Sequence, residues 1–206
     1  MSWEMKRELR DDTHEWVRWL VTSVARSLEH ASPEARRDVI VIQFLRDSIG
    51  QDRRRTGAWV AWNTDRRLRE MQAIASNPAE RASMEWNAHA YAEPPRDQIG
   101  DPLRDPEGAA ALERYVRDTG LWYEDDERTG TLHELKLWDA CSEALVNAAH
   151  APHDGVLEQL TGRDVPVFLE DNVNGPEHLQ ELNRRANPPQ FYERLDRWSL
   201  TCHSYE

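Results

Sequence analysis

Two apolar runs of strand length lie so close together in the chain that they are expected to be direct neighbours in a sheet. Residues 38–45 are apolar at six of eight positions and β-branched at four, which predicts a central strand buried on both faces. After a polar turn region, residues 47–57, a second strand is predicted at 58–62. This link is short enough for the two strands to form an antiparallel hairpin, which we expect.

Helical periodicity accounts for most of the remaining chain. Helices are predicted over the following ranges: 4–29, 63–76, 106–119, 132–150, 175–186 and 188–198. One more strand is predicted at 165–169, where Pro166 cannot donate to a ladder and so belongs at the strand start or on an edge. Adjacent strands without a crossover predict an α+β fold, with a small antiparallel or mixed sheet packed with several helices in a single domain over residues 1–206.

The helical patterns also predict which side chains face the core. In residues 63–76 the buried stripe is expected at Leu68, Met71 and Ile74. The inner face of the helix at 132–150 is expected to hold these residues: Leu132, Leu135, Trp138, Asp139, Ser142, Leu145, Val146 and Ala149. Most of the nine tryptophans are expected to fill the core, because Trp is the largest apolar residue.

One segment, residues 77–106, is rich in Pro and Asp and gives the weakest pattern. Within it, the stretch from Trp86 to Tyr91 favours a short third strand. Further along, Asn187-Pro188 predicts a break in the chain, because the residue before a proline avoids the helical region. Phe191, Leu195 and Trp198 then share one helical stripe, so we expect this tail to act as a structural clasp that closes the core.

The formal net charge of −12 is concentrated in the last third of the chain. Residues 121–206 hold seven Lys or Arg against seventeen Asp or Glu, whereas residues 1–60 hold eleven against ten. The acidity peaks in an insertion, residues 121–130, which contains the following run: Trp122, Tyr123, Glu124, Asp125, Asp126 and Glu127. Opposite potentials speed encounter, and Trp and Tyr are enriched among interface anchors. The pattern predicts a surface for a basic protein, with a merely solvating acidic loop as the alternative.

Several classes of function are excluded by the same composition. Nucleic-acid binding needs a cationic face, which a chain of this charge does not favour. No run of about eighteen apolar residues predicts a membrane span, and the N-terminus has no apolar signal region. Cys141 and Cys202 lie far apart with no CxxC spacing, so we expect a reducing cytoplasm and no disulfide framework. No cofactor is expected.

Two arrangements of histidine and cysteine are candidates for a metal site or a thiol nucleophile. His150 and His153 have a spacing that can hold zinc, but Pro152 interrupts the helix between them and no third ligand is near, so we expect a solvated helix end and no metal. Cys141 shares a predicted helix with His133, but eight residues separate them, about 12 Å along a helix axis. Cys141 is therefore predicted to be a core residue rather than a nucleophile.

Glu170 and Asp171 follow the strand predicted at 165–169 and form a candidate carboxylate pair for acid–base catalysis. The alternative is a solvated strand end that adds to the acidic surface. The basic cluster Arg53 to Arg55 is expected in an exposed hairpin turn, where it offsets some of the acidity. No Gly-rich phosphate loop, serine nucleophile elbow or HExxH motif occurs, so no catalytic site is predicted.

Two segments carry motifs of one known family. An Asn187-Pro188 pair and a Tyr192-Glu193 pair follow a strand ending in acidic residues and a helix, while Trp59 to Thr64 forms a strand that ends in Asn-Thr before a helix. These motifs resemble the bacterial family called domain of unknown function 4303, over about residues 15–200 apart from 93–130. The resemblance implies an α+β domain and the role of an immunity or accessory protein of a bacterial toxin system.

We therefore expect a cytoplasmic, non-enzymatic immunity protein that binds and neutralises a cognate toxin with a basic, nuclease-like surface. The expected binding residues are Trp122 to Glu127, joined by Glu170 and Asp171. Two alternatives stay open. One is an enzyme that uses the carboxylates of Glu170 and Asp171, and the other is a homo-oligomeric scaffold whose Trp-rich faces self-associate.

Overall fold

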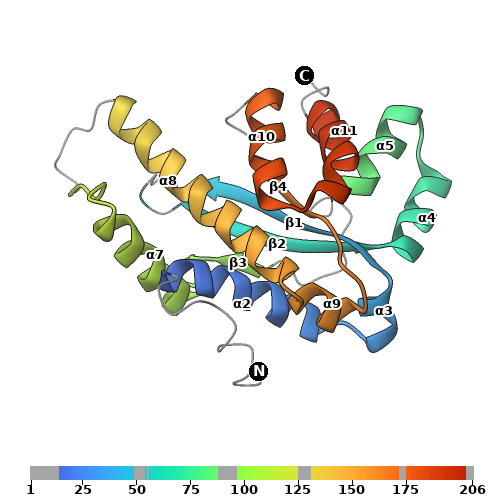
Figure 1. Ribbon diagram of the computed structural model, residues 1–206, viewed down its shortest axis with the longest axis horizontal. Coiled ribbons are helices and arrows are strands. Elements are labelled where there is room, and N and C mark those ends of the chain that lie inside the picture. The colour runs from blue at the N-terminus through green and yellow to red at the C-terminus, as the bar shows by residue number, and fades with distance from the viewer. Residues whose placement is uncertain are drawn as a thin grey trace.

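The computed structural model describes residues 14–48, 54, 56–87, 97–124, 131–171 and 175–202. Its elements follow one another in this order: α2 (Glu15–Glu29), α3 (Pro33–Arg37), β1 (Val39–Ser48), β2 (Thr56–Thr64), α4 (Asp65–Ile74), α5 (Pro78–Trp86), β3 (Asp97–Ile99), α7 (Pro106–Asp118), α8 (Thr131–His150), η3 (Ala151–His153), α9 (Val156–Thr161), β4 (Val167–Asp171), α10 (Pro176–Ala186), η4 (Pro189–Phe191) and α11 (Tyr192–Cys202). Figure 1 shows helices surrounding one mixed sheet, which confirms the α+β class.

The predicted hairpin forms the middle of the sheet. β1 pairs antiparallel with β2, so that Ile42 lies opposite Trp62 and Phe44 opposite Val60. On its other side, β1 pairs in parallel with β4, with Ile42 opposite Val167. The strand order is β3-β2-β1-β4, so the apolar run of β1 is central, as predicted, and β4 is an edge strand that begins directly after a proline.

The outer edge of β4 is closed by two asparagine side chains instead of another strand. Asn183 of α10 and Asn187, four residues further on, are both buried. The Asn187 side chain accepts from the Val167 N–H and donates to the Val167 carbonyl, both at 2.8 Å. Asn183 makes the same pair of bonds with Leu169, at 2.7 and 2.9 Å. Each side-chain amide supplies the acceptor and the donor that a neighbouring strand would supply. The outward-facing N–H and C=O groups of Val167 and Leu169 are therefore hydrogen-bonded and are not left to pair with another chain. The predicted clasp concerned the apolar stripe of the tail instead, and it is confirmed, because Leu195 and Trp198 are buried in a hydrophobic cluster against which Phe191 packs.

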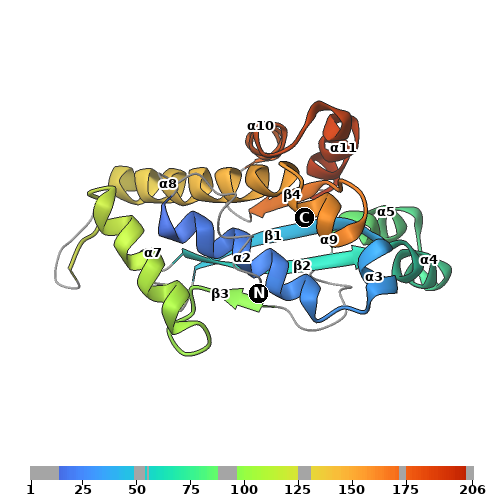
Figure 2. The same ribbon diagram turned by 60° about the horizontal axis from the view of Figure 1, so that its bottom comes forward.

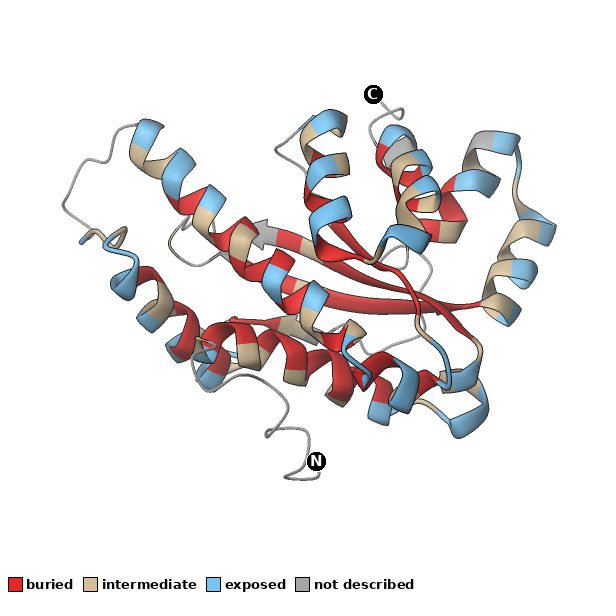
Figure 3. Ribbon diagram, in the orientation of Figure 1, coloured by how far each residue is buried: buried red, intermediate tan, exposed pale blue. Residues whose placement is uncertain are grey.

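Two hydrophobic clusters cover the two faces of the sheet. On one face, Ile42, Phe44 and Val60 pack with α2, α7 and α8. On the other face, the cluster consists of Ile40, Val41, Trp86, Phe168, Leu179, Leu195 and Trp198, which brings in α5, α10 and α11. Figure 3 shows the strands and the inner sides of the long helices as buried. The described tryptophans are mostly core residues, as expected: Trp16, Trp62, Trp86, Trp138 and Trp198 are buried.

Capping residues set several helix boundaries. The hydroxyls of Ser32 and Thr64 accept backbone N–H groups at the starts of α3 and α4. α7 opens on Pro106 and ends at Asp118, in agreement with the prediction for 106–119. The first long helix, by contrast, begins at Glu15 after the cap residue His14, and residues 4–13 of the predicted range lie outside the described residues.

The Pro/Asp-rich segment differs from its prediction. Asn77 caps a new helix, α5, which ends at Trp86, so the prediction of a strand starting at Trp86 is wrong at that residue. Its indole packs against Phe168, with ring centroids 5.6 Å apart. Residues 88–91 of the predicted strand lie outside the described residues. A different third strand, β3, pairs with β2, and its three residues are too few to leave an alternating pattern.

Two predicted inner faces are partly wrong. α4 has no buried residue, and Ile74 is 73% exposed. In α8, Leu132 and Leu135 were predicted to face the core but are 67% and 50% exposed. Leu137, which was not predicted to face the core, is buried. The first turns of α8 extend past the end of the core in Figure 1, so helical spacing alone does not decide burial there.

Candidate functional site

The described part of the acidic insertion lies between α7 and α8. Gly120 ends α7 in the left-handed conformation, with φ of 70°, and Leu121 to Glu124 follow without regular structure. Trp122 and Tyr123 are half-buried and pack against the main core, whereas Glu124 is exposed. The remaining predicted residues of the run, Asp125 to Glu127, lie outside the described residues.

Trp122 is held between two guanidinium groups. The Cζ atom of Arg117 lies 4.1 Å from the centroid of the indole and that of Arg54 lies 5.1 Å away. The indole N–H donates to Glu124 Oε1 at 3.0 Å. Cation–π contacts and this hydrogen bond together fix the ring, so Trp122 is pre-organised rather than freely rotating.

Tyr123 is fixed from both sides as well. Arg54 lies 4.8 Å from the Tyr123 ring centroid, and its Nη1 donates to the Tyr123 carbonyl at 2.8 Å. From α8, His133 meets the ring edge-on at 5.6 Å, and its Nε2 lies 2.7 Å from the Leu121 carbonyl oxygen. Arg54, expected in an exposed turn, is therefore half-buried against the insertion, while Arg53 and Arg55 lie outside the described residues.

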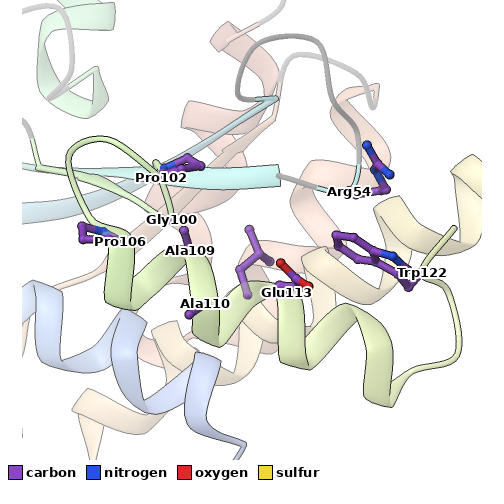
Figure 4. A pocket seen from close by; sticks show the side chains of 9 residues that line it. Arg54, Gly100, Pro102, Pro106, Ala109, Ala110, Glu113 and Trp122 are labelled. Atoms are coloured by element: carbon purple, nitrogen blue, oxygen red, sulfur yellow. The ribbon is translucent and has the colours of Figure 1, made fainter. Parts of the chain in front are cut away.

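A pocket of about 280 Å³ opens beside Trp122. Its lining is mostly apolar and comes from α7, the turn before it and the two flanking side chains, as Figure 4 shows: Arg54, Gly100, Pro102, Pro106, Ala109, Ala110, Leu112, Glu113 and Trp122. A pocket of this size takes one side chain or a fragment-sized molecule, since drug-sized ligands usually occupy about 300 Å³ or more.

The charges around Trp122 are balanced rather than acidic. Arg117 donates from Nε to Glu113 at 2.9 Å, and its Nη1 lies 3.8 Å from the Glu124 carboxylate. Together with Arg54, this makes two cations and two carboxylates near the indole among the described residues. Sequence reasoning missed Arg117, for which the available signal was a basic residue five positions before the tryptophan, across a glycine turn.

Glu170 and Asp171 are the last two residues of β4, and the side chain of Asp171 lies outside the described part of the structure. In the parallel ladder they lie opposite Leu45 and Arg46, respectively. Successive strand positions face opposite sides of a sheet, so positions 170 and 171 belong to different faces. Glu170 accepts a hydrogen bond from the buried amide of Gln43. The strand therefore gives no support to acid–base catalysis by these two neighbours acting together.

The histidines and the cysteine considered as sites have structural surroundings. Cys141 is buried in the core, as predicted. His153 corrects the expectation of a solvated helix end, because its side chain is 3% exposed and lies between two partners. Its Nδ1 is 2.6 Å from Asp164 Oδ1, and its Nε2 is 3.2 Å from Asn187 Oδ1. Among the described residues, no group of three or more His, Cys, Asp or Glu is arranged to hold a metal ion.

Three helices of the acidic last third lie along one side of the molecule. Figure 2 shows α8, α10 and α11 along one side, opposite α7 and β3. The arginines on α10 and α11 are largely held in ion pairs, which join Arg184 to Asp196, Arg185 to Glu143 and Arg194 to Glu85. Within the described residues, four exposed carboxylates on these three helices make no ion pair: Asp139, Glu177, Glu181 and Glu193. We call these four residues the acidic side.

Comparison with protein-family models, with curated proteins and with solved structures finds no match in any of the three. The resemblance to the domain of unknown function 4303 family thus rests on the motifs alone. Nor does any helix in the described part of the chain combine the length and apolar character needed to cross a bilayer.

Proposed function

We propose that the protein is a non-catalytic binding protein for a basic protein partner, in the concrete form of an immunity protein that covers the cationic groove of a nuclease-like toxin. The observation that carries the proposal is the acidic side, where carboxylates without ion pairs gather on α8, α10 and α11. Complementary potential steers encounter and selects against acidic partners.

Exposed leucines supply an apolar component on the same side. Leu132 and Leu135 lie on the outer surface of the first turns of α8, directly after the acidic run in sequence. Asp139 continues that surface one turn further along the helix. Charge sets the rate and orientation of encounter, whereas desolvated apolar contacts slow dissociation. This combination favours a protein partner over a free cation.

The Trp122 segment has a smaller role in this proposal than its sequence suggests. Glu124 is already offset by Arg117, and Trp122 is flanked by two arginines. A basic partner gains little from a locally balanced surface.

The test is binding of the purified product of the neighbouring gene, measured by surface plasmon resonance at 50, 150 and 500 mM NaCl. We expect the association rate constant to fall at least tenfold over this range, because screening shortens the reach of surface charge to about 8 Å at physiological ionic strength. Cytochrome c, a basic protein of unrelated structure, serves as the control for non-specific attraction.

The test variant removes four carboxylates and the control variant removes two, so their effects are compared per charge removed. Replacing all four acidic-side residues by Asn or Gln is expected to lower the association rate constant at least tenfold at 50 mM NaCl. Glu29→Gln with Glu107→Gln, exposed carboxylates away from this side, should leave it within twofold. Equal effects of the two variant sets, or binding that is insensitive to salt, would contradict the proposal.

A further inference from the structure

The side of the molecule opposite the acidic side carries an unusually exposed leucine on a firmly built turn. Leu103, between β3 and α7, is 94% exposed. The turn is closed by Asp101, whose Oδ1 accepts the N–H groups of Leu103 and Arg104 at 2.7 and 3.1 Å. Gly100 enters the turn with φ of 85°, in the left-handed region that favours glycine.

A second carboxylate ties the turn to the body of the protein. Asp105 Oδ2 accepts the Trp19 indole N–H and the Gly100 N–H, both at 2.9 Å, and Oδ1 accepts the Gly108 N–H at 3.2 Å. These bonds join the turn to α2 and to the first turn of α7. Leu103 is therefore presented on a fixed scaffold, which lowers the entropy lost when a partner covers it.

The Trp122 pocket lies next to this leucine. Pro102, the neighbour of Leu103, and Pro106 form one wall of the pocket, and Ala109 and Ala110 of α7 continue the lining. Figure 4 shows these residues along the helix and the turn, with Trp122 at the far end. One face thus carries a protruding apolar side chain and an apolar pocket large enough to receive one.

The charges near the leucine and the pocket are balanced. Asp101 and Arg104 flank Leu103, while Arg54 and Glu113 are the charged residues of the pocket lining. A chain with a net charge of −12 repels its own copy over most of its surface. Two copies can approach where that repulsion is locally cancelled, and the two carboxylates and two guanidinium groups named here cancel one another in formal charge.

We propose that this face pairs with the same face of a second copy, so that Leu103 of each chain enters the Trp122 pocket of the other. A two-fold arrangement requires one self-complementary patch, and a projecting group beside a matching pocket is such a patch. The contact is small, so the dimer is weak, with a dissociation constant of about 10–100 µM. The acidic sides of the two copies remain accessible to a basic partner.

Sedimentation velocity from 1 to 500 µM at 50 and 500 mM NaCl tests the pairing on the intact chain. We expect a monomer–dimer equilibrium that salt leaves unchanged or strengthens, because salt screens the residual repulsion between the copies. Leu103→Asp should raise the dissociation constant at least tenfold with an unchanged circular dichroism spectrum. Leu200→Asp, at a leucine that is 59% exposed on α11, is the matched control and should still dimerise.

Cysteine cross-linking tests the predicted geometry independently. In a background with Cys202→Ser, a mixture of Leu103→Cys and Ala109→Cys chains should form a disulfide-linked dimer, while the buried Cys141 stays inert. The control mixture replaces Leu103→Cys by Leu200→Cys. A chain that stays monomeric at 500 µM overturns the proposal and assigns the pocket to another molecule. A dimer that persists in Leu103→Asp, or that cross-links equally through position 200, also overturns it.

Discussion

Replacing Asn183 by alanine tests whether asparagine side chains close the edge of β4. Asn183 is fully buried, and its side chain makes three hydrogen bonds: from the Leu169 N–H at 2.7 Å, to the Leu169 carbonyl at 2.9 Å and to the Leu179 carbonyl at 2.9 Å. Alanine leaves the Leu169 N–H and carbonyl buried without their partner. Each orphaned group costs about 1–3 kcal/mol, so we expect a loss of about 3–5 kcal/mol in the free energy of unfolding.

This loss is large compared with the stability of a typical domain, about 5–15 kcal/mol. Urea unfolding at 25 °C, followed by tryptophan fluorescence, measures it directly. The midpoint should fall while the slope of free energy against urea stays constant, because the surface exposed on unfolding hardly changes. Asn147→Ala is the matched control, since Asn147 is exposed on α8 and the change of residue is the same. We expect this control to lie within about 0.5 kcal/mol of the wild type.

Asn183→Asp tests the acceptor and the donor roles of this side chain separately. The aspartate keeps an acceptor for the Leu169 N–H but places a carboxylate against two carbonyl oxygens, so it should be strongly destabilising at pH 7 and less so at pH 4, where protonation restores one donor. The reasoning is refuted if Asn183→Ala loses less than about 1 kcal/mol more than Asn147→Ala, because the edge groups of β4 would then not depend on the amide.

Two further predictions concern a glycine and a tyrosine. Gly100→Ala should lower the free energy of unfolding more than Gly120→Ala in urea titrations: both have positive φ, which costs about 1–2 kcal/mol, but only at Gly100 does the new methyl meet a neighbour, 3.1 Å from the Trp16 ring. Burial, and to a lesser degree the nearby Cys141 and Glu143, raises the pKa of Tyr115 to about 12. The unfolded phenol ionises near pH 10 and the folded one near 12. The contribution of Tyr115 to the free energy of unfolding is therefore complete below pH 10, and it falls by about 1 kcal/mol as the pH rises to 12, after allowing for solvent screening. Absorbance at 295 nm should show a late-titrating phenol that is missing in Tyr115→Phe, and titration of this phenol near pH 10 would contradict the assignment.

Local sequence signals located most elements because their physical causes are local. The β-branched run of β1 and the short link to β2 allowed one pairing only, and the caps at Ser32 and Thr64 mark helix starts that depend on neighbouring backbone groups. The signals failed where burial depends on distant elements. Ile74 and Leu132 have helical spacing suited to a core, yet none of the described elements covers them.

In the candidate site too, local features could be predicted from the sequence, whereas contacts between distant residues could not. The sequence located the aromatic and acidic run at residues 122–127, but it could not show that Arg54 and Arg117 would flank Trp122. Arg54 is 68 positions away in the chain, and no local pattern reports a contact of that separation. The pocket beside Trp122 likewise depends on how α7 and the turn before it pack.

The amino-acid sequence by itself determined the hairpin, the helix caps, the α+β class and the concentration of acidity in the last third, because each follows from neighbouring residues or from composition. Tertiary packing alone decided which charges remain without a partner. It placed Arg117 beside Glu124 and Arg185 beside Glu143, and it left Asp139 and Glu177 exposed without ion pairs. A charge count is a property of the chain, whereas a surface potential depends on which side chains the fold brings within about 4 Å of one another.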